Sequence, residues 1–441
     1  MNPQKETDVK WRLERKPTPN KLKQPNPNLP PTRWWTAEHQ ENPKTPPRDS
    51  GAGTDQDKVV RRADRNLIAP PPLDDLHCEG KGLDLRGRNE RKSEEIRERI
   101  STSNYIPANF VFGDSLVDAG NNNYILSLSK ANFLPNGIDF GRPTGRFTNG
   151  RTIIDIIGQE LGFGFTPPYL APTTIGPVIL KGVNYASGGG GILNSTGQVF
   201  GGRLNMDAQI DNFANTRHDI ISYIGVPAAL SLFQKALFSV TIGSNDFINN
   251  YLTPEVTSSE YKLDSPELFV TTMISRLRTQ LTRLFNLGAR KIVVANVGPI
   301  GCIPNQRDAH PMEGDNCVTF PNQLAYLFNT QLKGLIAELS SNLAGSTFVY
   351  ADIYHILGDI LLNYASFGFD DPSSACCNMA GKFGGLIPCG PTSKVCWDRS
   401  KYVFWDPYHP SDAANVVIAK RLLNGGSTDI SPMNIRQLFQ S

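Results

Sequence analysis

The 441-residue sequence lacks several features that mark particular protein classes. It has no run of about 18 apolar residues, and residues 1–31 contain no apolar stretch of the kind that a secretory signal needs. Neither sign of charge is in excess, since 44 Lys and Arg residues stand against 42 Asp and Glu residues. These absences argue against stable insertion into a membrane and against a nucleic-acid partner.

Sequence patterns for cofactors are missing as well. The glycine-rich stretch 188–191 is not followed by Gly-Lys-Ser/Thr, and its spacing does not match the G-x-G-x-x-G pattern of dinucleotide sites. No histidine lies at zinc-finger spacing from the cysteines. We therefore expect no metal and no other cofactor.

Cysteine is almost absent from the first 300 residues, where Cys78 stands alone. The other six cysteines fall in the C-terminal third: Cys302, Cys317, Cys376, Cys377, Cys389 and Cys396. This clustering favours disulfides formed in an oxidising compartment and leaves their pairing open. Asn194-Ser-Thr is an acceptor sequence for N-glycosylation, so we predict a glycan on Asn194, in agreement with secretion.

The composition divides the chain in two. Residues 1–104 are rich in proline, charged residues and asparagine, and their apolar pieces are too sparse to build a core. We interpret them as a disordered polar N-terminal extension. The composition changes abruptly at Tyr105, so we expect one folded domain over residues 105–441.

Within that domain, short apolar runs alternate with longer helical patterns. The runs 108–112, 182–186, 236–242, 291–296 and 347–351 are typical of buried strands. One helix is expected to begin after Ser265, followed by Pro266, and to end before Gly288, and a second is expected over residues 320–339. This alternation predicts a parallel sheet flanked by helices, with ligands beyond the carboxyl ends of the strands.

Ser115 directly follows the first predicted strand, in Phe110-Val-Phe-Gly-Asp-Ser115. Gly113 permits a tight turn that would present the serine hydroxyl at the edge of the sheet, as a nucleophile requires. The stretch differs from the G-x-S-x-G elbow of α/β-hydrolases. A serine after Gly-Asp is also a common helix N-cap, so this stretch alone leaves both interpretations open.

Near the other end of the chain, Asp406 and His409 lie three residues apart in the proline-bounded stretch Trp-Asp-Pro-Tyr-His-Pro. A serine becomes an effective nucleophile when an imidazole takes its proton, and a carboxylate then orients the imidazole and stabilises its charged form. His409 and Asp406 suit these two roles. The alternative is a plain turn in which Ser411 or Asp412 caps the last helix.

Two further stretches follow predicted strands, Asn184-Tyr-Ala-Ser-Gly-Gly-Gly-Gly191 and Ile242-Gly-Ser-Asn-Asp246. Backbone N–H groups of a glycine-rich turn and a side-chain amide can both donate hydrogen bonds to a negative oxygen. Gly188 and Asn245, together with the N–H of Ser115, are therefore the candidates for an oxyanion hole.

In this order, the four stretches resemble the plant GDSL esterase/lipase family of the SGNH hydrolase superfamily. The resemblance extends from Ile106 to Leu438 and includes the stretches 141–151, 296–304 and 431–438, whereas residues 1–104 lie outside it. It implies a three-layer α/β/α sandwich with a mostly parallel central sheet, flavodoxin-like in arrangement. It also implies that Ser115 attacks, that His409 is base and then acid, and that Asp406 orients it.

The resemblance implies a serine hydrolase that cleaves carboxylic esters of lipids or small acyl compounds through an acyl-enzyme. Two alternatives remain open. An acyltransferase would use the same serine with an alcohol as acceptor, and a binding protein would keep the fold without catalysis. Secreted family members carry an apolar signal peptide that this N-terminus lacks. Either the protein is not exported, or this N-terminus is a misassigned gene model attached to the mature domain of a secreted enzyme. We favour the second interpretation and expect the enzyme to be extracellular, because six clustered cysteines suit an oxidising compartment.

Overall fold

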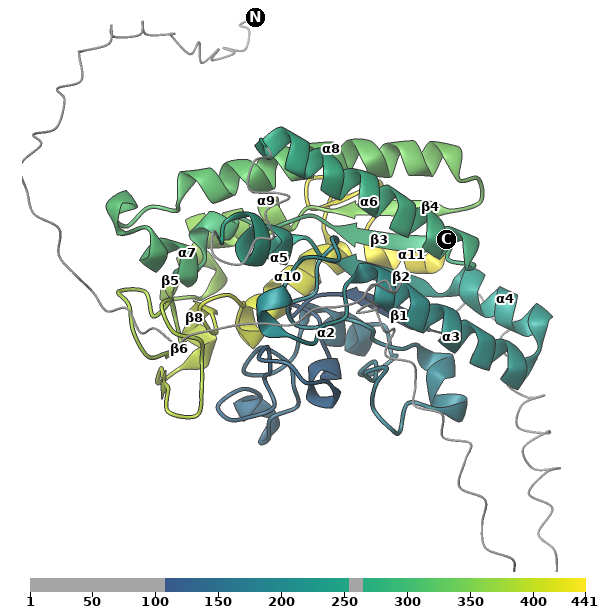
Figure 1. Cartoon of the computed structure of the whole chain (residues 1–441), viewed down its shortest axis with the longest axis horizontal. Coiled ribbons are helices and arrows are strands. Elements are labelled where there is room, and N and C mark those ends of the chain that lie inside the picture. The colour runs from purple at the N-terminus through teal and green to yellow at the C-terminus, as the bar shows by residue number, and fades with distance from the viewer. Residues whose placement is uncertain (1–107, 254–264) are drawn as a thin grey trace, which may run out of the picture. The chain divides into compact units, whose positions relative to one another are not determined.

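The computed structural model describes residues 108–253 and 265–441 (Figure 1). The predicted extension over residues 1–104, its boundary at Tyr105 and Cys78 all lie outside these described residues.

Five strands form the central sheet of the described part, in the order β1-β2-β3-β4-β9. The first four are parallel: β1 (Asn109–Gly113), β2 (Leu237–Thr241), β3 (Lys291–Ala295) and β4 (Thr347–Ala351). The short β9 (Ile430–Ser431) pairs antiparallel with β4. Four of the five apolar runs are thus confirmed as strands of a mostly parallel sheet.

The fifth run, 182–186, forms an extended edge segment and not the regular strand that we predicted. It meets β1 at a single bridge between Val111 and Asn184. Gly182 has a φ of 106°, and a Cβ placed on it would lie 1.9 Å from the carbonyl oxygen of Asn109. The chain approaches β1 closely at this glycine. The segment then exchanges backbone hydrogen bonds with β1 through the N–H groups of Val111, Tyr185 and Ser187, without becoming a regular strand.

Helices cover both faces of the sheet. One layer contains α3 (Met206–Ile224), α4 (Val226–Lys235), α6 (Pro266–Asn286) and α8 (Thr319–Asn342), and the other contains α2 (Ile153–Glu160), α9 (Ile353–Leu362), α10 (Asp412–Asn424) and α11 (Ile435–Gln440). Figure 1 shows α6 and α8 running side by side. They are the two predicted helices, and Ser265 caps α6 by accepting the N–H of Leu268 at 3.3 Å. The three-layer α/β/α sandwich is confirmed.

Shorter elements connect these layers. They are α5 (Ser244–Asp246), the π-helical turn Phe247–Tyr251, α7 (Pro304–Ala309), β5 (Asp371–Ala375), β6 (Cys377–Asn378), β7 (Lys394–Val395), β8 (Tyr402–Phe404) and 3-10 turns at 121–124, 138–140, 176–181, 198–200, 300–302, 311–313, 364–367 and 399–401. Strand β5 is parallel to β8, and β6 is antiparallel to β7. Among the described residues, no helix combines the length and apolarity that crossing a membrane requires.

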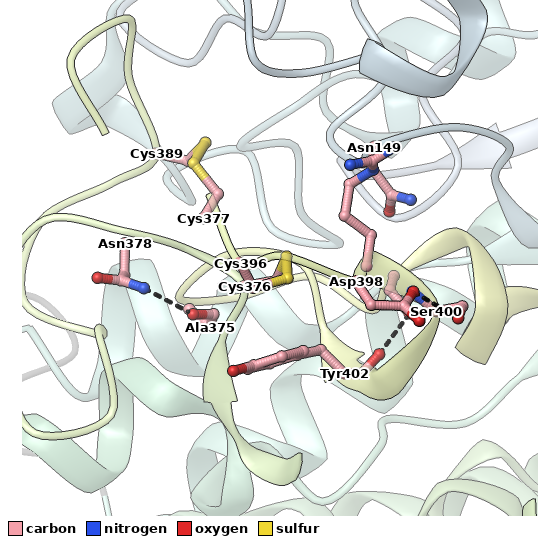
Figure 2. The surroundings of a disulfide bond; sticks show 12 residues. Asn149, Ala375, Cys376, Cys377, Asn378, Cys389, Cys396, Asp398, Ser400 and Tyr402 are labelled. Carbon is pink, nitrogen blue, oxygen red and sulfur yellow. Dashed lines mark hydrogen bonds between the residues drawn. A yellow bond between two sulfur atoms is a disulfide. The ribbon is translucent and has the colours of Figure 1, made fainter. Parts of the chain in front are cut away.

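All six clustered cysteines form disulfides, as expected. The pairs, which the sequence left open, are Cys302–Cys317, Cys376–Cys396 and Cys377–Cys389. Figure 2 shows the last two, which start from neighbouring residues of the chain. The loop closed by Cys377–Cys389 lies inside the loop closed by Cys376–Cys396.

Successive side chains of each strand point to opposite faces of the sheet and so enter two different cores. We call the cluster between the sheet and α3, α4, α6 and α8 the aromatic core, and the cluster on the α2, α9, α10 and α11 side the aliphatic core. The strands give the aromatic core large side chains, including Phe110, Phe112, Phe238, Phe348 and Tyr350. To the aliphatic core they give smaller ones, including Val111, Val293, Ala295, Val349 and Ala351.

Candidate active site

Ser115 lies in a turn at the carboxyl end of β1. Gly113 is required there because a Cβ would lie 2.4 Å from the carbonyl oxygen of Thr241. The carboxylate of Asp114 accepts the N–H of Leu116 at 3.0 Å and closes the turn. No helix in the described part of the chain begins at this serine, so the N-cap interpretation of Ser115 is wrong.

Asp406 and His409 lie in a tight loop between β8 and α10. The N–H of Trp405 donates to the carbonyl of His409 at 2.8 Å, which closes the loop. Asp406 Oδ1 accepts the N–H groups of Tyr408 and His409, both at 2.8 Å, so the loop backbone fixes the carboxylate. Ser411 also caps α10, accepting the N–H of Ala414 at 3.2 Å, so the capping interpretation and the placement of His409 hold together.

The structure brings Ser115, His409 and Asp406 into one chain of hydrogen bonds. Nδ1 of His409 lies 2.8 Å from both oxygens of Asp406, and Nε2 lies 2.8 Å from Oγ of Ser115. With the proton on Nδ1, the imidazole donates to the carboxylate and Nε2 accepts from the serine hydroxyl. Asp406 and His409 are only 6% and 7% exposed, and the ring of Phe147 packs 5.3 Å from the imidazole, so water is largely kept from the pair.

The two neighbouring disulfides support the loop that carries Asp406 and His409. The N–H of Cys376 donates to the carbonyl of Phe404 at 3.1 Å, and the N–H of Cys377 donates to that of Trp405 at 2.7 Å. The fully buried Trp405 ring packs among the cysteines, and its indole N–H donates to Asn136 at 2.9 Å. The cross-linked segment in Figure 2 is therefore directly bonded to the backbone that precedes Asp406.

Asn245 lies beyond the carboxyl end of β2, and its amide orientation is fixed from both sides. Its Nδ2 donates to the carbonyl of Gly190 at 2.9 Å, and its Oδ1 accepts from Nδ2 of Asn249 at 2.6 Å. One N–H of the amide remains for a ligand. The neighbouring Asp246 accepts from the backbone of Ile192 and Leu193, both at 2.9 Å, and so ties the glycine-rich turn to α5.

Gly188 is placed differently from its predicted role. Its N–H donates to Oδ2 of Asp118 at 3.1 Å, a bond within the protein. The next residue, Gly189, lines the cavity beside Ser115. Within the described part of the chain, the N–H groups of Gly189 and Ser115 form no hydrogen bond, so both are available to a ligand.

Comparison with known proteins agrees with this geometry. The model of the GDSL-like lipase/acylhydrolase family matches residues 110–422. The chain belongs to this family. The GDSL esterase/lipase At4g16230 of Arabidopsis thaliana is 65% identical over 334 residues, which cover 76% of this chain and 91% of the relative. The GDSL esterase/lipases At2g23540 and At3g50400 of the same plant are 52% and 53% identical and cover 75% and 76% of this chain, and 87% and 91% of the relatives.

As a GDSL lipase/acylhydrolase, the chain is a carboxylic ester hydrolase with the predicted SGNH-type fold. Its substrates are small-molecule or lipid esters.

A cavity of about 220 Å³ opens beside Ser115 in this GDSL hydrolase. Ser115, Asn245 and His409 contribute polar atoms to its lining, whereas Leu128 and Phe200 give it an apolar rim. Among the described residues, no group of His, Cys, Asp or Glu side chains is arranged to hold a metal ion. The cavity thus offers a nucleophile, a base and hydrogen-bond donors beside an apolar surface.

Three buried carboxylates of the GDSL hydrolase support the site and were not singled out from the sequence. Burial raises the pKa of Asp114 to about 7, and those of Asp118 and Asp246 to about 6. All three lie close to candidate site residues in the sequence. Asp114 precedes Ser115, Asp118 lies three residues after Ser115, and Asp246 follows Asn245. The sequence did contain a signal for these three residues. An aspartate next to a candidate site residue often accepts backbone N–H groups and so shapes the turn that carries that residue.

Asn194 of the GDSL hydrolase lies on an exposed position in the turn after the glycine-rich stretch. Its backbone carbonyl accepts from Arg203 at 2.7 Å and from Asn205 at 2.8 Å. The exposed position is compatible with a glycan, and the modification itself stays a prediction.

Proposed function

We propose that Ser115, His409 and Asp406 form the catalytic triad of this ester hydrolase. The unbroken hydrogen-bond chain from Ser115 Oγ through the imidazole to the Asp406 carboxylate, ending at a cavity, carries the proposal. Nucleophile, base and orienting acid are each within hydrogen-bond distance of the next, as general-base activation of a serine requires.

In the first half of the reaction, Ser115 Oγ attacks the ester carbonyl carbon while Nε2 of His409 takes the hydroxyl proton. The carbonyl oxygen becomes negative and is held by the N–H of Ser115 and the free amide N–H of Asn245. Gly188 was the predicted third donor. Because Asp118 already accepts its N–H, we propose the neighbouring N–H of Gly189 for this role. His409 then protonates the departing alcohol, which leaves the acyl group on Ser115.

In the second half, water replaces the alcohol. Nε2 of His409 takes a proton from the water, whose oxygen attacks the acyl carbon, and the proton passes to Ser115 Oγ as the acid is released. Asp406 stabilises the imidazolium in both halves without accepting its proton.

Active-site labelling tests the triad directly. A serine-reactive alkyl phosphonate should add one adduct to the protein, detected by intact mass, and peptide mapping should place it on Ser115. Ser115→Ala should lose the adduct and the hydrolysis of acyl esters, and His409→Ala should slow both by about 10⁴-fold or more. Ser366→Ala, which removes an exposed serine outside the cavity, is the matched control.

Labelling at another residue, or full hydrolysis by Ser115→Ala, would refute the triad. Product analysis with a competing alcohol separates the alternatives. Transfer to the alcohol in preference to water would identify an acyltransferase, and a folded wild type without labelling would identify a binding protein.

We also propose that residues 105–441 form the complete catalytic unit and that the enzyme is extracellular. Its three disulfides suit an oxidising compartment. A protein beginning at Asn104 should keep the kcat/KM of the full chain. After secretion from a plant host, a glycosidase should shift the mass of the wild type and leave Asn194→Gln unchanged.

A further inference from the structure

The cavity beside Ser115 continues from the polar groups at its mouth into the aliphatic core. Its inner walls include Val293 and Ala295 of β3, Ile154 of α2, Leu357 of α9, Leu422 of α10 and Ile435 of α11. These residues come from one face of the sheet and from all four helices that cover it. The cavity therefore extends between the sheet and the helical layer.

Two residues of this wall keep a small exposed fraction although they lie inside the protein. Val293 lies in the middle of β3 and is 6% exposed, and Leu357 is 7% exposed, although helices cover both. Ile292, which precedes Val293 in β3 and points into the aromatic core, is 0% exposed. The exposed fraction of Val293 and Leu357 thus faces the internal cavity.

An apolar cavity that extends between a sheet and the helices that cover it is unusual in a protein interior. Interiors are packed about as densely as organic crystals, and unfilled volume lowers stability because the lining atoms lose contacts. The described lining residues beyond the mouth carry no charge, since Asp114, Lys130, Asp406, Tyr408 and His409 are the charged or titratable residues of the whole lining. A ligand that fills the inner part must itself be apolar.

We propose that this inner cavity is a tunnel for the acyl chain of the ester, so that the enzyme selects substrates with medium-length or long apolar acyl groups. The proposal rests on Ser115 as the nucleophile and deepens the proposed function by naming the substrate class. With the ester carbonyl at Ser115, the acyl chain enters the tunnel and the alcohol part remains at the mouth.

Chain-length dependence follows from burial of the acyl chain. Each methylene group that the tunnel removes from water raises kcat/KM by up to about fourfold. Dodecanoyl esters should therefore react much better than butanoyl esters of the same alcohol. Ala295→Leu adds branched carbon atoms to the tunnel wall, and the ratio of kcat/KM for dodecanoyl over butanoyl esters should fall by at least about tenfold. Leu357→Ala should shift the preference toward hexadecanoyl esters.

The matched control is Ala419→Leu, the same exchange in the same core at a residue that is fully buried and does not line the cavity. It overpacks the core and should lower the Tm while leaving the chain-length ratio as in the wild type. Ala295→Leu fills existing space, so its Tm should equal or exceed that of the wild type.

A binding measurement makes the tunnel testable apart from catalysis. Dodecanoate should raise the Tm of Ser115→Ala, and adding Ala295→Leu to that variant should abolish the shift. An unchanged ester ratio in Ala295→Leu, with Ser115 still labelled by the phosphonate, overturns the tunnel and leaves the triad intact. If Ser115 is not labelled, the triad fails, and the dodecanoate shift still decides for or against the tunnel.

Discussion

The two faces of the central sheet differ in the size and packing of their side chains. On the aromatic side, Phe110, Phe213 and Phe238 pack with ring centroids 5.1 to 5.3 Å apart and are fully buried. On the aliphatic side, the same strands present valine and alanine, and a cavity remains between them and the helices. The period-two alternation of each strand thus separates large from small side chains, so that one sheet borders both a dense core and a cavity.

The proposed catalytic groups lie at the edge that borders the cavity. Ser115 follows β1, Asn245 follows β2, and the loop of Asp406 and His409 leads into α10 of the aliphatic side. Parallel strands bring their carboxyl ends to one edge, where loops from distant parts of the chain meet. In the proposed mechanism, the dense core holds the sheet in place and the side with the cavity receives the substrate.

The difference in packing between the two faces can be tested most directly by the same Leu→Ala substitution in each core. Leu281→Ala in α6 of the aromatic core should lower the free energy of unfolding by about 4–5 kcal/mol. Leu357→Ala in α9 should lower it by only about 2–3 kcal/mol, because one side of Leu357 already faces the cavity and has fewer contacts to lose. Chemical denaturation of both variants measures the difference. Equal losses would mean that the cavity is closed in solution.

A second prediction concerns the edge of the sheet and affects rate more than stability. Asn245→Ala should lower kcat by about 10²–10³-fold, because one donor to the oxyanion is lost. The loss should appear in kcat with little change in the Tm. Asn249→Ala removes the bond that orients the Asn245 amide and should give a smaller loss of about tenfold. A kcat for Asn245→Ala close to that of the wild type would remove Asn245 from the oxyanion hole.

Removing individual disulfides tests which of them stabilise only the fold and which also affect the proposed active site. Replacing Cys377 and Cys389 by serine should lower the free energy of unfolding by about 2–4 kcal/mol and also lower kcat, since Cys377 bonds the backbone just before Asp406. Replacing Cys302 and Cys317 should lower stability by a similar amount, with a smaller change in kcat. Equal changes in kcat would show that the disulfides act on stability alone.

Local sequence patterns were sufficient for most of the fold. Four strands and two long helices could be predicted because periodicity, the Ser265 cap and the bounding glycines each act within a few residues. The edge segment 182–186 was predicted as a regular strand, but it has a single bridge with β1, where Gly182 approaches Asn109 closely. That approach is a tertiary contact, which no window of sequence contains.

The candidate site could be predicted at the level of side-chain chemistry. Ser115, His409 and Asp406 were identified by residue type and by resemblance, and the structure places them within hydrogen-bond distance. The bond between Gly188 and Asp118 joins two loops 70 residues apart and was not predictable. The cavity was not predictable either, because it depends on the combined volumes of side chains from the sheet and four helices.

The last prediction concerns the pH dependence of stability that a buried carboxylate beside the cavity should cause. The edge beside the cavity holds Asp114, which is buried and has one carboxylate oxygen, Oδ2, without a hydrogen-bond partner in the described part of the chain. Burial raises its pKa from 3.8 to about 7. The folded protein therefore binds more protons than the unfolded chain between these values, and the free energy of unfolding should decrease as pH rises from about 4 to about 7, by at most about 1.4 kcal/mol per pH unit.

Asp114→Asn keeps the size of the side chain and removes this titration, so its unfolding free energy should depend less steeply on pH over the same range. Denaturation at several pH values measures both slopes, with the exposed Asp370→Asn as a control that should behave like the wild type. Asp118 and Asp246 also have raised pKa values of about 6 and keep part of the slope in every variant. A slope unchanged by Asp114→Asn would show that Asp114 is ionised throughout this range, and that a group outside the turn of Ser115 compensates its charge.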